Sequence, residues 1–383
     1  MRLVSVKFSE FEGETQEWTL EGLTLGSTNL IVGKNATGKS RSLNIISTLS
    51  RHLAGLQAPT ISAKYEVVFK DDENTLKYKL NIERYEVVEE ELKVNDEVKL
   101  NRGKAGIGNI WFAEMDCMLK FQTPPGELAA FARRDSIQHP FLEPLHAWGT
   151  SLRHFHFGSP LGKDQVAFYE DQGGRQSDDR NPNEVVSLFG NAKEEFKDEF
   201  VKAVIDDMSN IGYDIEKIEL GPPVSIRWAR AVLPQFVTLN VKEKHLKGLT
   251  DQINMSQGMF RALSILIQVN YSQFSKKSDC ILIDDIGEGL DFDRSCCLIK
   301  LLREKAIKSA IQLILSTNDR FVMNQVPLEE WSVLQLDGSH VRVRNYENSR
   351  EIFEEFKFTG LSNFSFLEMD FINEASNEEI ASK

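Results

Sequence analysis

One stretch near the N-terminus has the residue types that can enclose a phosphate group. It reads Gly33, Lys34, Asn35, Ala36, Thr37, Gly38, Lys39 and Ser40. The glycines allow backbone N–H groups to surround phosphate oxygens, and a following helix adds the positive end of its dipole. In this pattern the lysine reaches the β- and γ-phosphates of a nucleotide, and the serine hydroxyl holds Mg²⁺. Arg41 follows directly, and we include it among the candidate nucleotide-binding residues.

A second candidate site is a pair of acids behind an apolar run. Residues 280–283 are apolar and lead into Asp284 and Asp285. A buried strand would place Asp284 at its carboxyl end, where ligands bind in open α/β sheets. Asp284 would then hold Mg²⁺ through water, and Asp285 stands where a base that polarises an attacking water is expected. An apolar strand that ends in acids is common, so this pattern indicates a nucleotide site only in combination with the glycine-rich segment at residues 33–40.

The third feature is Met255–Arg261, which reads MSQGMFR and opens a predicted helix. Ser256 at a helix start, with Gly258 close behind it, presents a hydroxyl and free N–H groups to an anion. Gln257 lies between them. This short segment alone does not indicate a function. It becomes informative because of its order and spacing ahead of Asp284.

The elements that must position these residues alternate between strand and helix. Residues 27–32 predict a buried strand and 37–56 a helix, whereas period-two alternation over 61–100 predicts an antiparallel sheet with one solvated face. ELAAFAR, residues 127–133, reads as a further strand. The later predictions are helix at 256–273, strand at 279–284, helix at 292–306 and strand at 310–315. This alternation favours a parallel sheet.

Composition restricts the class of protein. The chain has 383 residues, 41% hydrophobic and 27% charged, which is typical of a globular protein. We expect a cytoplasmic protein with no membrane segment, because no apolar run is long enough to span a bilayer. The net charge of −13 gives no general attraction to phosphate backbones, so nucleic acid is possible but not indicated.

The three motifs, in this order, resemble the ABC-type ATPase heads of SMC, RecF and OLD-like proteins. The resemblance implies an α/β P-loop NTPase fold with a parallel core sheet, an antiparallel β lobe and an inserted, partly helical lobe. It also implies ATP and Mg²⁺ as cofactors, and a head-to-tail homodimer or higher oligomer. In that family a signature segment, here MSQGMFR, contacts the γ-phosphate held by the other subunit. Lys39, Ser40, Asp284 and Asp285 of one copy would thus meet Ser256 and Gly258 of its mate.

The same resemblance assigns further positions. Asp291 matches an aspartate that communicates across the dimer, and Asn318 occupies the place of a switch histidine. A glutamine that senses Mg²⁺ and the γ-phosphate should follow a strand and open the inserted lobe. Gln138 fits this role best, as a catalytic and metal-linked residue, and Gln122 is the alternative.

Two departures from the family pattern predict slow ATP hydrolysis. Asp285 replaces a glutamate, so its carboxylate is one methylene shorter. Asn318 replaces a histidine and cannot be protonated near neutral pH. A clamp that responds more to ATP binding than to hydrolysis is therefore the expectation.

The expected organisation has four parts. An N-terminal ATPase lobe covers 1–135, an inserted mixed lobe 136–250, a C-terminal ATPase half 251–355, and an aromatic and acidic tail 356–383. The Phe-rich tail is expected to dock on its own core, with a partner-binding element as the sharper alternative. We divide the chain at these boundaries because the motifs cluster in the first and third parts.

The biological role rests on the resemblance alone. The chain resembles stand-alone ATPases of the AAA15/AAA21-type group found in prokaryotic anti-phage defence modules. This implies an ATP-dependent regulator of a separate effector, a nuclease or a toxin. The alternatives are a DNA-repair ATPase of RecF or SMC type, the motor subunit of a membrane transporter, and a nucleotide-binding scaffold with little catalysis.

A weaker signal is the segment from Leu152 to Phe157, where alternation puts His154 and His156 on one strand face. Two histidines could begin a metal site, but no third ligand is apparent from the sequence. A half-exposed strand with stacked imidazole rings is the favoured interpretation.

Overall fold

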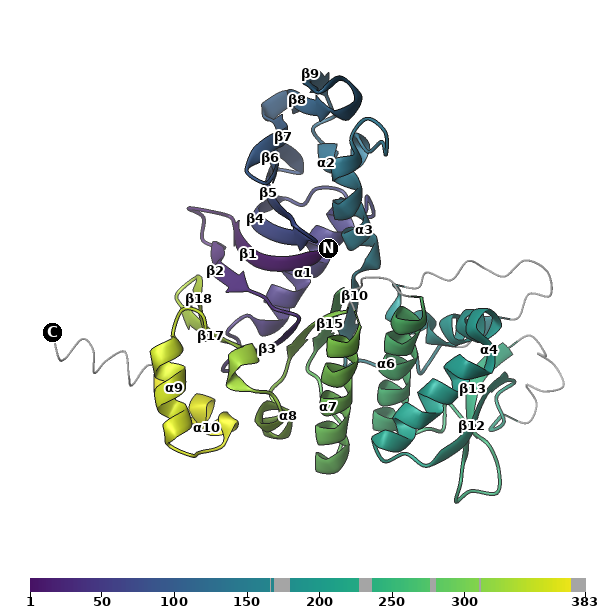
Figure 1. The fold of residues 1–383 in the computed structure, drawn as a ribbon. Coiled ribbons are helices and arrows are strands. Elements are labelled where there is room, and N and C mark those ends of the chain that lie inside the picture. The colour runs from purple at the N-terminus through teal and green to yellow at the C-terminus, as the bar shows by residue number, and fades with distance from the viewer. Residues whose placement is uncertain (166, 169–179, 227–235, 276–279, 310, 373–383) are drawn as a thin grey trace. The chain divides into compact units, whose positions relative to one another are not determined.

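The computed structural model describes residues 1–165, 167–168, 180–226, 236–275, 280–309 and 311–372. The chain divides into two compact units (Figure 1). The first combines residues 1–152 with 327–383, and the second spans 153–326. The chain therefore leaves the first unit, builds the second, and returns to complete the first.

The first unit is built on one long sheet. Its strands are β1 (Arg2–Glu10), β2 (Trp18–Thr24), β3 (Thr28–Val32), β4 (Ser62–Asp71), β5 (Asn74–Glu83), β6 (Glu86–Val94), β7 (Glu97–Arg102), β8 (Ile107–Phe112), β9 (Cys117–Gln122), β17 (Trp331–Asp337) and β18 (His340–Asn345). Their order is β3-β17-β18-β2-β1-β4-β5-β6-β7-β8-β9. β3 and β17 are parallel, as are β2 and β18. β4 to β9 form an antiparallel series; the alternation over residues 61–100 predicts its part from β4 to β7, and β8 and β9 extend it.

Two helices of the first unit pack against this sheet. Helix α1 (Lys39–Leu53) buries Leu43 and Leu49 completely, as its helical spacing predicts. Helix α3 (Glu143–Ser151) brings Trp148 onto Phe69 of β4, with ring centroids 4.9 Å apart. This packing holds α1, and with it the loop that precedes α1, against the sheet.

The expectation of a strand at residues 127–133 is wrong, because the segment forms the short helix α2 (Ala129–Ala132). The reason lies in β6. The Glu90 carboxylate accepts hydrogen bonds from the backbone N–H groups of Ala129 and Ala130, each at 2.8 Å. The buried carboxylate accepts from the first N–H donors of a helical turn. In a strand, these N–H groups would point in other directions.

Glu90 is the centre of a buried polar network. The Tyr78 hydroxyl donates to it at 2.9 Å, and the Arg102 guanidinium lies 3.6 Å away. The Glu90 and Arg102 side chains have no exposed surface. Burial raises the pKa of Tyr78 well above its ordinary value. The network therefore joins β5, β6 and β7 to α2 through groups that are costly to leave unpaired.

The C-terminal aromatic segment packs on its own unit. It forms α9 (Arg350–Phe358) and α10 (Asn363–Glu368). Phe353, Phe356 and Phe366 are buried, and the Phe366 ring lies 6.5 Å from that of Trp331 in β17. The predicted docking onto the core is thus confirmed for these rings. Residues 373–383 lie outside the described part of the chain.

The second unit contains a parallel three-strand sheet and a small antiparallel one. β10 (Arg153–His156), β15 (Cys280–Asp284) and β16 (Gln312–Ser316) pair in that order in the parallel sheet. β11 (Ala167–Phe168), β13 (Phe236–Glu243) and β12 (Ile215–Gly221) form the other, and β14 (Thr250–Asp251) pairs with β13. The helices are α4 (Val185–Asn210), α6 (Gln257–Phe274), α7 (Phe292–Lys308) and α8 (Arg320–Gln325). Helix α6 is buried along most of its length.

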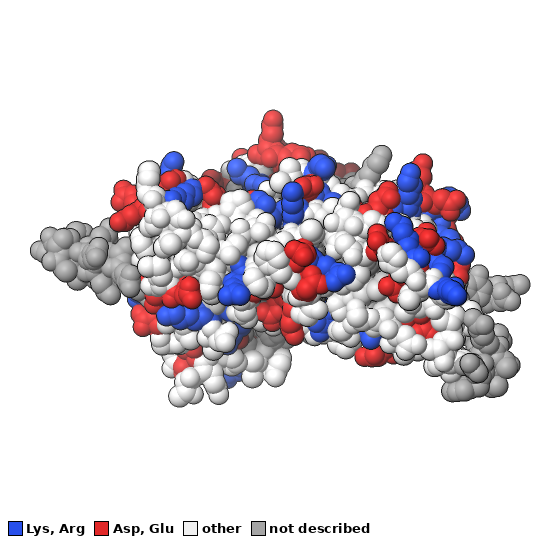
Figure 2. Space-filling view, turned by 90° about the horizontal axis from the view of Figure 1, so that it is seen from below, with Lys and Arg blue, Asp and Glu red and all other residues white. Residues whose placement is uncertain are grey.

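One face of the molecule carries mixed charges. On the face drawn in Figure 2, lysine and arginine side chains lie among aspartate and glutamate side chains, with no broad area of one sign. This distribution accords with the net charge of −13. In the part of the chain that the structure describes, none of the helices has the length and apolar character to cross a bilayer.

The buried network predicts a large stability effect at one position. Replacing Glu90 by Gln removes the charge opposite Arg102 and leaves one helix N–H without an acceptor, so the free energy of unfolding should fall by about 3 kcal/mol. The exposed neighbour Glu89, changed to Gln, is the control and should alter it by less than about 0.5 kcal/mol. Urea titration of both variants measures this, and equal midpoints would show that the network adds nothing.

Candidate nucleotide-binding site

The predicted phosphate-binding loop follows β3, which is buried along its whole length. The loop is tight: a Cβ on Gly33 would lie 2.6 Å from Thr37 Oγ1 and 2.8 Å from the Leu334 backbone oxygen. Only glycine fits there without displacing backbone. Helix α1 then begins at Lys39, with no acidic residue in its first turn, so the positive end of the helix dipole stays available to an anion.

Lys39 lies across this loop rather than in solvent. The residue is 7% exposed, and its Nζ donates to the Gly33 oxygen at 2.9 Å and to the Lys34 oxygen at 3.2 Å. Ser40 is half-buried in the first turn of α1, whereas Asn35 and Ala36 are exposed on the loop. A buried ammonium next to a helix start is the arrangement that binds a phosphate chain.

The other two cations of this segment already have acidic partners. Lys34 pairs with Asp370 at 2.9 Å, and Arg41 pairs with Glu10 at 2.6 Å. The Arg41 guanidinium also lies 4.4 Å from the centre of the Trp18 ring. Both pairs are exposed to solvent in part, so they contribute little stability and could exchange for phosphate contacts.

In the second unit, the two predicted acids and Asn318 lie close together. Asp284, 5% exposed, ends β15, and its carboxylate accepts a hydrogen bond from the Ser316 hydroxyl at the end of β16. The same hydroxyl accepts from the Asp285 N–H at 3.1 Å. The Asn318 side-chain amide donates to the Asp285 carboxylate at 3.4 Å. Parallel strands thus deliver these groups to one edge of the sheet.

Asp285 has a left-handed backbone conformation, with φ at 54°. Aspartate and asparagine occupy this region more often than most non-glycine residues because their short side chains form local hydrogen bonds. The backbone therefore gives a physical reason why an aspartate suits this position.

His156 belongs to this group, although the sequence interpretation placed it in no site. β10 runs parallel to β15 with His156 opposite Asp284, and His156 Nδ1 lies 3.6 Å from Asp284 Oδ2. This contact with the Asp284 carboxylate raises the pKa of His156. The His154 and His156 rings are neighbours on one strand face, as predicted, with centroids 4.3 Å apart, but they are tilted by 47° and not stacked. Burial lowers the pKa of His154 to about 4.

The signature segment begins helix α6. Ser256 caps the helix, accepting a hydrogen bond from the Met259 N–H at 3.2 Å, and the residue is exposed. Gly258 is buried, and a Cβ there would lie 2.7 Å from the Gly289 oxygen. Residue 258 is therefore glycine because the loop after β15 passes directly over it. Gln257 donates to the Ser159 oxygen at 3.4 Å.

Arg261 fixes this helix to two loops. Its guanidinium donates to the Ser159 oxygen at 3.0 Å and to the Gly158 oxygen, both in the segment after β10. It also donates to the Glu288 oxygen at 2.9 Å, in the segment after β15. Arg261 is 8% exposed. One buried cation therefore links the signature helix to the segments that follow His156 and Asp285.

Asp291 lies at the start of α7. It caps this helix by accepting from the Arg294 N–H at 3.0 Å, and it also pairs with the Arg294 guanidinium. The backbone hydrogen bond from Arg294 lowers the pKa of Asp291. Asp291 is exposed, so a second protein surface could reach it.

Neither candidate glutamine lies near the phosphate-binding loop. Gln138 follows helix α2 instead of a strand, and its backbone oxygen accepts from the Ala113 N–H just after β8. Gln122 ends β9, at the edge of the first unit's sheet. In the sheet order, β8 and β9 are at the opposite end from β3. The strand that opens the second unit is β10, and His156 is its last residue.

A Mg²⁺ ion would find suitable oxygen donors in the predicted residues. Within the described residues, no group of three or more His, Cys, Asp or Glu side chains is placed to hold a metal. Nucleotide-bound Mg²⁺ needs only one or two protein oxygens, because phosphates and water complete its shell. The Ser40 hydroxyl and the Asp284 carboxylate are donors of this hard type, so the residues fit the ion.

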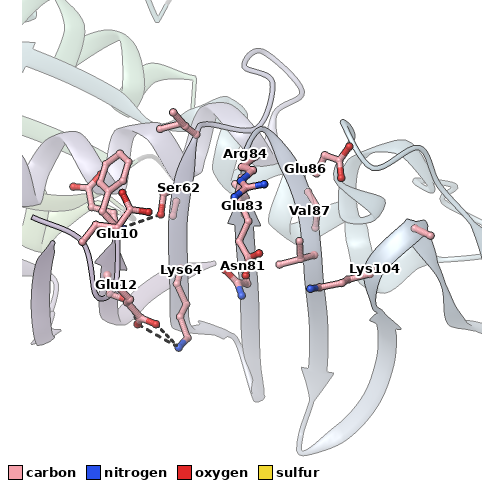
Figure 3. Close-up of a pocket in the computed structure, with 18 residues that line it drawn as sticks. Glu10, Glu12, Ser62, Lys64, Asn81, Glu83, Arg84, Glu86, Val87 and Lys104 are labelled. Atoms are coloured by element: carbon pink, nitrogen blue, oxygen red, sulfur yellow. Dashed lines mark hydrogen bonds and ion pairs between the residues drawn. The ribbon is translucent and has the colours of Figure 1, made fainter. Parts of the chain in front are cut away.

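A separate cavity of about 630 Å³ lies in the first unit, over β4, β5 and β6 (Figure 3). Glu12 and Lys64 pair at 3.3 Å on one side of it, and Glu83, Arg84 and Glu86 line it further along. None of the predicted site residues lines this cavity. It is therefore distinct from the phosphate-binding loop.

Comparisons with known proteins agree with this architecture at the level of the fold. No protein-family model matches the sequence, and no curated protein matches it. Among solved structures, an SMC head bound to the C-terminal winged-helix domain of ScpA aligns with a TM-score of 0.53 at 11% identity, over 92% of this chain and 100% of that one.

Two other SMC head structures also align, with lower scores. The head domain from Thermotoga maritima has a TM-score of 0.47 at 12% identity, over 90% of this chain and 99% of that one. The head with an extended coiled coil, bound to a ScpA domain from Pyrococcus furiosus, has 0.48 at 13%, over 93% and 99%. The alignment with a TM-score of 0.53 shows that the chain has the mixed α/β fold of SMC head domains, which confirms the predicted fold class.

Proposed function

We propose that this chain is an ATP-binding clamp in which two copies enclose ATP and Mg²⁺ and hydrolyse the nucleotide slowly. One copy supplies Lys39 and Ser40 to the phosphates and the metal, with Asp284 holding the metal and Asp285 polarising water. Its mate supplies Ser256 and Gly258 to the γ-phosphate. Similarity to SMC heads supports the fold that such a clamp needs.

The observation that carries this proposal is the state of the signature helix. Ser256 is exposed at its start, while Arg261, a turn further on, is buried and bonded to the segments after β10 and β15. A rigid helix end with an exposed hydroxyl and free N–H groups is suited to an external anion. We infer that this anion is the γ-phosphate of ATP bound to a second copy.

The role of Asn318 in the clamp follows from its contact with Asp285. The amide donates to the carboxylate at 3.4 Å and cannot take up a proton as an imidazole does. Asn318 would therefore orient Asp285 or a phosphate oxygen without shuttling a proton, which accords with slow turnover. Asp291, exposed at the start of α7, would face the mate.

The clamp predicts a specific effect of Ser256→Asp. Aspartate is as good a helix cap as serine, so α6 should persist, but its charge would repel a γ-phosphate. We expect ATP-dependent dimerisation, measured by analytical ultracentrifugation with Mg²⁺ and ATPγS, to weaken at least about tenfold. Nucleotide binding by the single copy should remain. Ser362→Asp, at the exposed start of α10, is the matched control. Unchanged dimerisation of the Ser256 variant would count against the clamp.

Hydrolysis should depend on the Asp285 carboxylate. Asp285→Asn keeps both the size and the left-handed backbone preference but removes the base, so phosphate release should fall by about 100-fold. The ATP-dependent dimer should survive. Asp293→Asn, on the exposed first turn of α7, is the control. Turnover that is undiminished by the Asp285 change would show that another group activates the water, and wild-type turnover no faster than the uncatalysed reaction would leave a scaffold as the better description.

We further propose that the clamp regulates a separate effector, a nuclease or a toxin, in prokaryotic anti-phage defence. The resemblance of its motifs to stand-alone defence ATPases supports this role. The competing DNA-repair role requires a surface that attracts DNA, and the mixed charges in Figure 2 and the net charge of −13 disfavour one. A DNA affinity that rises with ATP and falls steeply with salt would favour DNA repair over effector control.

A further inference from the structure

The ends of β10 and β15 place an imidazole beside the carboxylate that the clamp needs for its metal. His156 is paired in register with Asp284, and the two side chains approach to 3.6 Å between Nδ1 and Oδ2. The Phe157 N–H donates to the Asp284 oxygen at 2.9 Å, which continues the pairing beyond the strand end. The approach is therefore fixed by backbone hydrogen bonds on both sides of His156.

This spacing suits two ligands of one metal ion. Ligands at roughly 2.1 Å from an ion, at right angles or tetrahedral angles to each other, lie about 3.0–3.4 Å apart. The observed 3.6 Å needs only a small side-chain rotation to reach that range. The His156 side chain is 52% exposed and Asp284 is 7% exposed, so the imidazole can turn while the carboxylate stays fixed.

The surroundings restrict where His156 can turn. The His154 ring packs against it at 4.3 Å on the same strand face. Beyond it, Arg261 holds the oxygens of Gly158 and Ser159. The backbone after the imidazole is thus held, and His156 ends its strand at the same sheet edge as Asp284.

We propose that His156 is a direct ligand of the divalent cation bound with the nucleotide, and that the site therefore prefers Mn²⁺ or Co²⁺ to Mg²⁺. This rests on the proposed function, since the nucleotide supplies the remaining oxygens. Imidazole nitrogen is a poor ligand for Mg²⁺ but a good one for later first-row metals. Because His156 precedes the segment that Arg261 ties to the signature helix, metal ligation would also stiffen that segment.

The test uses the full chain with Mn²⁺ and ATPγS, read by electron spin-echo envelope modulation. Wild type should show ¹⁴N coupling from a directly bound imidazole, and His156→Ala should lose it. His340→Ala is the matched control, because His340 is 50% exposed and lies 3.7 Å from the Glu17 carboxylate, in the other unit. That variant should keep the ¹⁴N signal.

A second readout is the ratio of phosphate release with Mn²⁺ to that with Mg²⁺. Wild type should favour Mn²⁺, whereas His156→Gln, which offers an oxygen ligand, should shift the ratio toward Mg²⁺ by about tenfold. Two outcomes would overturn this inference and leave the clamp intact, provided that ATPγS and Mn²⁺ still bind in a way that needs Lys39. One is the absence of ¹⁴N coupling in wild type, and the other is coupling that persists in His156→Ala. Failure of wild type to bind nucleotide at all would overturn both.

Discussion

A single buried guanidinium holds the functional segments of the second unit in place. Arg261 bonds to backbone oxygens on the segments after β10 and after β15, while its helix begins with the exposed Ser256. Without this cation, the backbone oxygens of Gly158, Ser159 and Glu288 would lose a hydrogen-bond donor. Arg261 thus joins the start of α6 to the segments that follow β10 and β15.

Much of the site was predictable because its signals are local. The phosphate-binding loop needs only consecutive residues, and the tight approach at Gly33 explains why glycine begins it. The strand that ends in Asp284 and the helix capped by Ser256 also follow from short patterns. The order of these motifs then predicted the fold, which the similarity to an SMC head confirms.

The failures have a common physical cause, namely contacts between segments distant in sequence. Residues 127–133 have apolar alternation that suits a strand, but Glu90, on another strand, supplies the acceptor that makes them a helix. Gln138 then loses the strand on which its assignment depended. The sequence raised His156 as a possible metal ligand but not its neighbour, because nothing in its own segment indicates that Asp284 lies beside it in the sheet.

The central claim is that one copy's signature meets the phosphate held by another copy. A structure of the full chain carrying Asp285→Asn, with bound ATP and a divalent cation, tests it most directly. The account predicts a two-fold dimer in which the Ser256 hydroxyl lies within hydrogen-bond distance of a γ-phosphate whose other oxygens contact Lys39 of the mate. ATP held by one copy alone, with Ser256 in open solvent far from any phosphate, would contradict it.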